Sequence, residues 1–432
     1  MPISITAALS GFHLREFNRT VRLFFLYGIS INAGMALFTL LYNLYLLRLG
    51  YQEDFIGQVA GMAPLATGLL ALPAGMLSDR FGRKPFLVGS SLLLTVSQLG
   101  LCFAGAPGAL LAFSFVGGLG SACIWVNHVP FLADNAHPSR RAEALVIWTA
   151  LQVVIRMLLS MAGGLMPGAL AWFLGASTEM PEPFRYSLLL GAFFSLVAVL
   201  PLLAVEGRTR HQVSSGAPPE EADADSGRPW RVCTAIAVLS AGRGFSMGLT
   251  YPFFNVFFEE ELRVGPAAIG AIFFLSQLVS LPTTFGAPSL VRRLGPTAAI
   301  LCARCIGGGA VAVMGAAISL PVAVAMFLLV RAGEVIDNPS DQHFSTQVLP
   351  RRYWARIQGF RVCGFQIFSF AGSIFGGMLI LEHGYWAAFG LAGAARIASG
   401  AIMAAFFGLA PRPDERFSLE ADRASRGRRQ RR

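Results

Sequence analysis

The stretch GMLSDRFGRK, residues 75–84, places one carboxylate and three cations within ten residues, together with two glycines. Apolar runs of about twenty residues, long enough to span a bilayer, precede and follow it. Only 13% of the 432 residues are charged, 54% are hydrophobic, and the mean hydropathy is +0.59. Soluble domains carry about 25% charged residues. The composition therefore predicts an integral membrane protein in which residues 75–84 form a loop between two spans.

Long unbroken apolar runs predict helical spans, because a helix forms all its backbone hydrogen bonds internally and is therefore stable in lipid. The strands of a membrane β-barrel would instead alternate polar and apolar residues. The one long polar interruption, 206–230, is rich in Pro, Gly, Ser and acids and is typical of a flexible linker. It divides the chain into 1–205 and 231–411, six spans each, followed by a basic tail at 412–432. The predicted spans cover about 21–48, 55–77, 85–105, 108–133, 142–172, 185–205, 231–258, 266–287, 296–318, 320–345, 355–380 and 385–410.

The distribution of cations predicts the orientation of these spans. Twenty-five of the 34 cations fall in alternate loops, the linker and the two terminal segments, whereas only Arg48, Arg185 and Arg263 lie at the opposite ends. Because Lys and Arg in short loops stay in the cytoplasm, both termini and the linker are expected there. The net charge of +10 is then a topology signal with anionic lipid as its partner, and a nucleic-acid partner is not expected. We expect a monomer in the cell membrane.

Residues 75–84 resemble the loop 2–3 signature of the major facilitator superfamily, G-x-L-[AS]-D-[RK]-x-G-[RK]-[RK], at every defined position. The second half holds a weaker copy, PSLVRRLGPT, in which Gly295 aligns with Gly82 and Arg292 stands where Asp79 would. Such internal symmetry suits a parallel repeat of two helical halves. The resemblance implies an all-α membrane fold of twelve helices in two pseudo-symmetric bundles, and secondary active transport by alternating access.

The same resemblance implies a conformational latch at the cytoplasmic side. Asp79 would face the N-terminus of span 11, where the helix dipole favours an anion. An arginine of the loop would pair with Asp134 at the inner end of span 4, and the glycines would allow a neighbouring helix to approach closely. The predicted latch comprises Gly75, Asp79, Arg80, Gly82, Arg83 and Asp134.

Charged residues at membrane depth cost about 2.5–3.5 kcal/mol each on insertion scales, so they are candidates for function. The resemblance implies that spans 1, 4, 7 and 10, helped by 2, 5, 8 and 11, line a central cavity. Arg304 and Arg396 belong to the peripheral spans 9 and 12, and we expect them to snorkel or to pack between helices. The candidate substrate-binding residues lie on polar helix stripes of the lining spans, and they are Arg156, Arg243, Arg331, Arg361, Asn32 and Gln152.

Arg156 and Arg243 have no evident acidic partner in the sequence, and we expect them to face each other across the cavity and to share one anionic substrate. Guanidinium groups bind carboxylate or phosphate with two parallel hydrogen bonds. Glu334 and Asp337 are the candidate proton-coupling residues, since a buried acid beside a movable cation can load and release a proton. The alternative is that they form static ion pairs, Glu334 with Arg331 and Asp337 with the arginine of span 11.

The predicted function is proton-coupled transport of a small organic anion, and three alternatives stay open. The 35 phenylalanines favour export of drugs or other amphiphiles, although Ser114 occupies the arginine position of the span 4 signature of proton-driven exporters. Neutral solutes and a non-transporting membrane sensor are further alternatives. Six scattered histidines without an H-E-x-x-H pattern do not predict an enzyme or a metal site, and no cofactor is expected.

Overall fold

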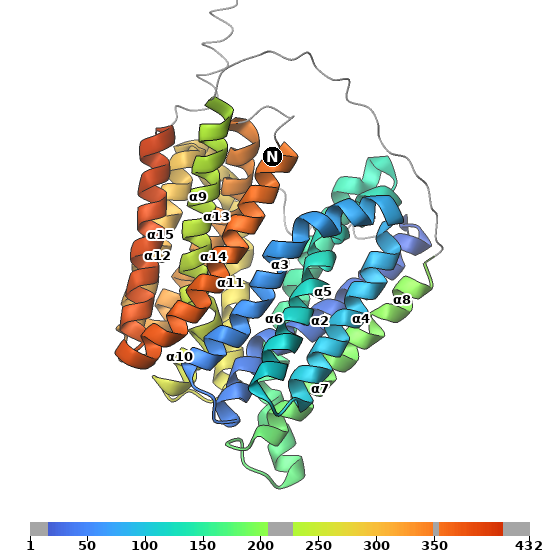
Figure 1. Ribbon diagram of the computed structural model, residues 1–432, viewed down its shortest axis with the longest axis vertical. Coiled ribbons are helices and arrows are strands. Elements are labelled where there is room, and N and C mark those ends of the chain that lie inside the picture. Colours follow the sequence, from blue (N-terminus) through green and yellow to red (C-terminus); the bar gives the residue numbers. More distant parts are fainter. Residues whose placement is uncertain (1–15, 206–227, 349–353, 409–432) are drawn as a thin grey trace, which may run out of the picture. The chain divides into compact units, whose positions relative to one another are not determined.

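The chain folds into long helices joined by short turns. The computed structural model (Figure 1) describes residues 16–205, 228–348 and 354–408, and no strand occurs among them. The first series of helices is α2 (Arg19–Arg48), α3 (Glu53–Phe81), α4 (Arg83–Phe103), α5 (Pro107–Asn135), η2 (Pro138–Arg140), α6 (Arg141–Leu174), α7 (Pro181–Val197) and α8 (Val199–Leu203). The second is α9 (Arg228–Thr250), η3 (Tyr251–Phe253), α10 (Phe254–Glu260), α11 (Pro266–Leu294), α12 (Pro296–Gly315), α13 (Leu320–Val348), α14 (Trp354–His383) and α15 (Tyr385–Phe407).

These helices confirm the predicted class of fold. Within the described part of the chain, eleven helical segments are long and apolar enough to cross a membrane. A further long helix, α13, carries four ionisable residues in its middle. Each predicted span therefore has a helix at its place. The predicted linker lies almost entirely in 206–227 and the basic tail in 412–432, both outside the described residues.

Glycine sets the sharp junctions that follow α3 and α11. Gly82 has φ 91° and ψ 146°, and Gly295 has φ 82° and ψ 158°, a backbone region that is essentially restricted to glycine. The two residues that align between the halves of the sequence thus adopt one conformation. Among the described residues, a Cβ at Gly82 would meet Pro85 alone, 3.9 Å away, so its backbone conformation is the reason for glycine that the structure shows. At Gly75 the space is tight, with Val126 at 3.3 Å from the position of a Cβ.

The chain forms two compact units. The first contains Met1–Tyr42 and Leu70–Glu221, and the second contains Asn43–Leu69 and Ala222–Arg432. The end of α2 and the start of α3 therefore pack with the second unit: Arg48 pairs with Glu259 of α10, and Tyr385 of α15 donates a hydrogen bond to Glu53. The sequence analysis places all of residues 1–205 in one half, so it does not predict that residues 43–69 pack with the second unit.

In the first unit, aromatic side chains form the core. Phe24 lies at the centre, with ring centroids 4.7 Å from Phe131, 4.7 Å from Trp148 and 5.2 Å from Tyr27. All four side chains are buried. These apolar contacts hold α2, α5 and α6 together.

In the second unit, glycines bring α12 and α15 into close contact. A Cβ at Gly308 would lie 2.8 Å from the carbonyl oxygen of Gly393, so only hydrogen atoms fit between these backbones. Small residues allow this approach in membrane helices. The neighbouring Gly307 and Gly400 leave room for two large side chains, Arg396 and Arg304. The glycine interface thus allows two arginines to enter the interior of the second unit.

Candidate functional site

Arg304 of α12 is the centre of a buried ion-pair network in the second unit. Its Nε lies 3.0 Å from Asp337 Oδ1, and its Nη2 lies 3.3 Å from Asp341 Oδ1. Both carboxylates belong to α13, one turn apart on the same face. A third contact runs from Arg304 Nη1 to Ser399 Oγ of α15, at 3.4 Å. The side chain of Arg304 is 1% exposed, and it contacts the inner oxygen, Oδ1, of both carboxylates.

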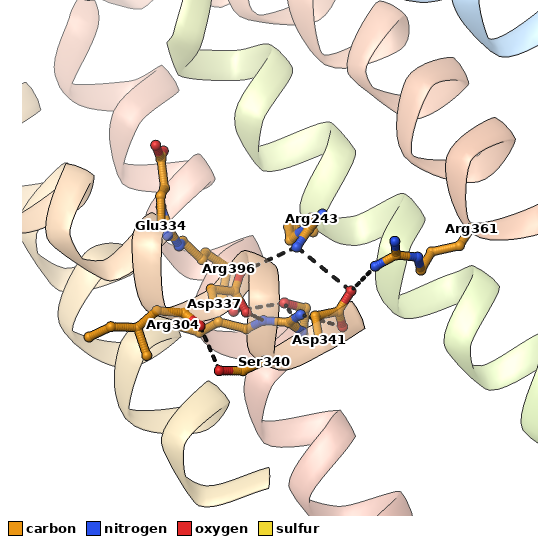
Figure 2. Close-up of polar contacts among 10 residues, drawn as sticks. Arg243, Arg304, Glu334, Asp337, Ser340, Asp341, Arg361 and Arg396 are labelled. Carbon is orange, nitrogen blue, oxygen red and sulfur yellow. Dashed lines mark hydrogen bonds and ion pairs between the residues drawn. The ribbon is translucent and has the colours of Figure 1, made fainter. Parts of the chain in front are cut away.

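The outer oxygens of the same two carboxylates face arginines from other helices (Figure 2). Arg243 of α9 has its Nη1 at 3.7 Å from Oδ2 of Asp337 and at 3.7 Å from Oδ2 of Asp341. Arg361 of α14 donates a 2.9 Å hydrogen bond from Nη1 to Asp341 Oδ2. The guanidinium of Arg243 also lies over the ring of Phe365, 5.0 Å from its centroid. Each carboxylate therefore contacts Arg304 through Oδ1, and at least one further arginine lies within ion-pair distance of its Oδ2.

Glu334 forms a second group one turn away on α13. Its Oε2 accepts a 2.5 Å hydrogen bond from Arg331, and its Oε1 lies 3.7 Å from Nη1 of Arg396 of α15. The guanidinium of Arg331 lies 5.6 Å from the ring centroid of Tyr251. Both oxygens of this carboxylate are thus within reach of a cation.

The network carries more positive than negative charge. Five guanidinium groups, those of residues 243, 304, 331, 361 and 396, share three carboxylates. A buried charge without a counter-charge is costly, whereas a paired one is tolerated. In Arg243, moreover, Nε and Nη1 find no hydrogen-bond partner within the described part of the chain. The network thus has an excess of about two positive charges and N–H donors of Arg243 that are available to a ligand. Such a group of side chains can bind an anion.

Two expectations about these residues need correction. Arg243 does have acidic neighbours, because the helical spacing on α13 aims both aspartates at α9. The acid that pairs with Arg361 is Asp341 and not Asp337. Of the two expected alternatives for Arg304, packing between helices is the one observed, because the acids of α13 enclose its guanidinium. The i, i+3, i+7 spacing of the three acids was the available signal for one shared face.

The predicted residues of the first half lie in the first unit. Arg156 of α6 is half-buried and donates from Nε to the carbonyl oxygen of Gln152 at 3.1 Å and from Nη2 to its Oε1 at 3.3 Å. Asn32 of α2 donates to the carbonyl oxygen of Gly28 on its own helix. The predicted sharing of one substrate by Arg156 and Arg243 stays a prediction, since each unit is described by itself.

The charged loop forms a small cluster within the first unit. Arg83 contacts both Asp134 of α5 and Asp79, the latter at 3.1 Å. Arg80 lies over the ring of Phe81 instead, 5.5 Å from its centroid. The expected contact of Asp79 with the start of span 11 would join the two units, each of which is described by itself, and it stays a prediction.

The comparison with known families agrees with the charged loop and the helical architecture. The profile of the Major Facilitator Superfamily matches residues 23–336. The chain belongs to this superfamily. Its family and fold are those of transporters, and its apolar helices make it a multi-pass membrane protein.

Similar proteins within the family include transporters of different kinds. A putative metabolite transport protein, YfiG of Bacillus subtilis (strain 168), is 29% identical over 160 residues, which are 37% of this chain and 32% of YfiG. The multidrug resistance protein MdtL of Shigella flexneri serotype 5b (strain 8401) is 30% identical over 111 residues, 26% of this chain and 28% of MdtL. These matches span about a third of each relative. The crystal structure of the nucleoside transporter NupG superposes with a TM-score of 0.72 at 14% identity, covering 90% of this chain and 99% of NupG.

Proposed function

We propose that this protein is a secondary active transporter that moves a small organic anion across the cell membrane, coupled to protons, by alternating access. The observation that carries the proposal is the excess of positive charge in the buried network of the second unit. A neutral substrate would leave this excess uncompensated, whereas an anion would offset it.

The geometry of Arg243 and Arg361 supports an anion as ligand. Their side chains are 12% and 9% exposed, so they are largely desolvated yet not enclosed as Arg304 is. A guanidinium in a partly dry environment binds carboxylate or phosphate more strongly than it does in water. Arg331 belongs to the proposed site through its position on α13, and Arg156, Asn32 and Gln152 would contribute from the first unit.

Coupling to protons is proposed because the carboxylates compete for the same cations as the substrate. Glu334 and Asp337 are the acids proposed for this role, each beside two arginines. The proposed topology has both termini and the linker in the cytoplasm, and the proposed assembly is a monomer. The cluster of Arg83 with Asp79 and Asp134 would act as a cytoplasmic latch that breaks when that side opens.

The test is a thermal-shift panel on the purified chain in detergent. Monocarboxylates, dicarboxylates, phosphorylated metabolites and cationic dyes are added in turn, because a ligand that binds only the folded state raises Tm. We expect stabilisation by anions, lost in Arg243→Ala and kept in Arg293→Ala, a variant that removes an exposed arginine at the end of α11. Stabilisation by dyes alone, or an anion effect equal in both variants, contradicts the proposal.

A second candidate is export of drugs or other amphiphiles, which the similarity to MdtL over 111 residues favours. The aromatic ring of Phe365 against Arg243 would also suit an amphiphile that carries a ring. In the same panel, this function predicts that hydrophobic cations stabilise the protein and that Phe365→Ala removes the effect.

A further inference from the structure

One carboxylate oxygen in the network lies between two arginines of different helices. Oδ2 of Asp341 accepts a hydrogen bond from Arg361 at 2.9 Å and lies 3.7 Å from Nη1 of Arg243. Because both guanidinium groups reach the same oxygen, they are close enough to be bridged by a single small anion. Asp341 Oδ2 thus occupies the position that one oxygen of a bound carboxylate, phosphate or sulfate would take (Figure 2).

The other acids of α13 do not have this position. Asp337 lies within ion-pair distance of Arg243 but not of Arg361. Glu334 contacts Arg331 and Arg396. Neither of its oxygens forms an ion pair with Arg243 or Arg361, the two arginines that face Oδ2 of Asp341. Neutralising Asp341 would therefore remove the one carboxylate that both of these arginines share, freeing Arg361 and leaving Arg243 only its 3.7 Å contact with Asp337.

We propose that Arg243 and Arg361 form an anion site that Asp341 closes, and that a proton bound by Asp341 opens it. The inference rests on the proposed anion transport and assigns its coupling proton to Asp341 in place of Glu334 and Asp337. The ligand is a small anion with two or more oxygens in a planar or tetrahedral group.

The step is a simple proton transfer with a balanced charge. A proton from water binds Oδ2 of Asp341, forming an O–H bond and removing one negative charge. Arg243 and Arg361 then lose their shared acceptor, and two oxygens of the anion replace it. Release of the anion restores the pair with Asp341 and returns the proton to water. Proton and anion bind together, so each raises the affinity for the other, which is the linkage that a symporter needs.

Four helices contribute charged groups around Asp341. Arg304 of α12 holds its Oδ1 at 3.3 Å, so the carboxyl group stays in place when Oδ2 is protonated. Arg243 of α9 and Arg361 of α14 face Oδ2, and Asp337 lies one turn away on α13. Arg396 of α15 lies beside Glu334. Arg304, Arg243 and Arg361 thus surround the Asp341 carboxylate, with Asp337 as the neighbouring acid, so an anion that enters between Arg243 and Arg361 competes with Asp341 for the same cations.

The experiment measures the apparent Kd of sulfate by thermal-shift titration of the full chain between about pH 5 and pH 8. Sulfate remains a dianion over this range, so any pH dependence belongs to the protein. For the wild type we expect Kd to rise with pH, by up to about tenfold per pH unit for one linked proton. Asp341→Asn should bind sulfate tightly with no such dependence, because the acceptor that Arg243 and Arg361 share is then permanently neutral. Asp341→Glu should restore the dependence.

The control is Glu382→Gln, which removes an exposed carboxylate at the end of α14 and should behave as the wild type. If Asp341→Asn binds sulfate with the pH dependence of the wild type, the role of Asp341 is wrong while the anion site stands. If sulfate stabilises neither the wild type nor Asp341→Asn, the anion site itself is wrong, and the proposed function fails with it.

Discussion

Replacing Arg304 with methionine tests whether the buried network stabilises the second unit. The side chain of Arg304 is 1% exposed and lies between Oδ1 of Asp337 at 3.0 Å and Oδ1 of Asp341 at 3.3 Å. Methionine fills a similar volume but leaves both carboxylates without their rear partner. Removing one member of a buried ion pair costs about 3–5 kcal/mol.

The expected loss is at the lower end of this range, about 3 kcal/mol. Asp341 keeps its 2.9 Å contact with Arg361, whereas Asp337 keeps only Arg243 at 3.7 Å. Removing a cation also relieves some repulsion in a network with excess positive charge. The attraction still dominates, because the carboxylate oxygens lie directly against Arg304 and the other guanidinium groups lie beyond them.

The assay is thermal unfolding in detergent, followed by tryptophan fluorescence. A loss of about 3 kcal/mol corresponds to a fall in Tm of roughly 6–12 °C if the second unit melts like a soluble domain of about 200 residues. Ser399→Ala is the matched control, since it removes only the 3.4 Å contact to the same guanidinium and should change the stability by about 1 kcal/mol or less. The double variant Arg304→Met/Asp337→Asn should recover about 1–2 kcal/mol, because the carboxylate left with the weaker contact is then neutral. An unchanged Tm in Arg304→Met, or strictly additive effects in the double variant, would refute this reasoning.

Three further outcomes follow from the local geometry and the charge pattern. Gly82→Ala should lower stability by about 1–3 kcal/mol in unfolding measurements, because φ at this position is 91°, whereas Gly89→Ala within α4 should be neutral or stabilising; equal effects would contradict the conformational explanation. In a background without native cysteines, an impermeant thiol reagent added from outside should label a cysteine at Glu260 but not one at Ser215, and the reverse pattern would invert the topology. Asp79→Asn should change Tm little, because its side chain is 68% exposed, yet should slow uptake into proteoliposomes; an unchanged uptake rate would remove the latch role.

The class of fold and the positions of the helices were predictable from the sequence because they depend on local composition. An apolar run of about twenty residues has few alternatives to a membrane helix. Gly82 and Gly295 were also recognisable as a related pair, although the reason lies in their backbone conformation rather than in close packing. The packing of residues 43–69 with the second unit was not predictable, since it depends on contacts between segments about two hundred residues apart, such as Arg48 with Glu259.

The candidate site divides in the same way. The sequence by itself determined which charges enter the membrane, because few residues are charged and each one at membrane depth is conspicuous. Only the tertiary structure decided their partners. Arg304 and Arg396 looked peripheral by their order in the chain, yet glycine-mediated contact between α12 and α15 places them behind the acids of α13. The long side chain of an arginine can reach acceptors several ångströms from its helix axis, so helical spacing fixes the face from which it starts. The packing of neighbouring helices fixes which carboxylate it meets, and for this reason Asp341 emerged as the shared partner of three arginines only once the fold was known.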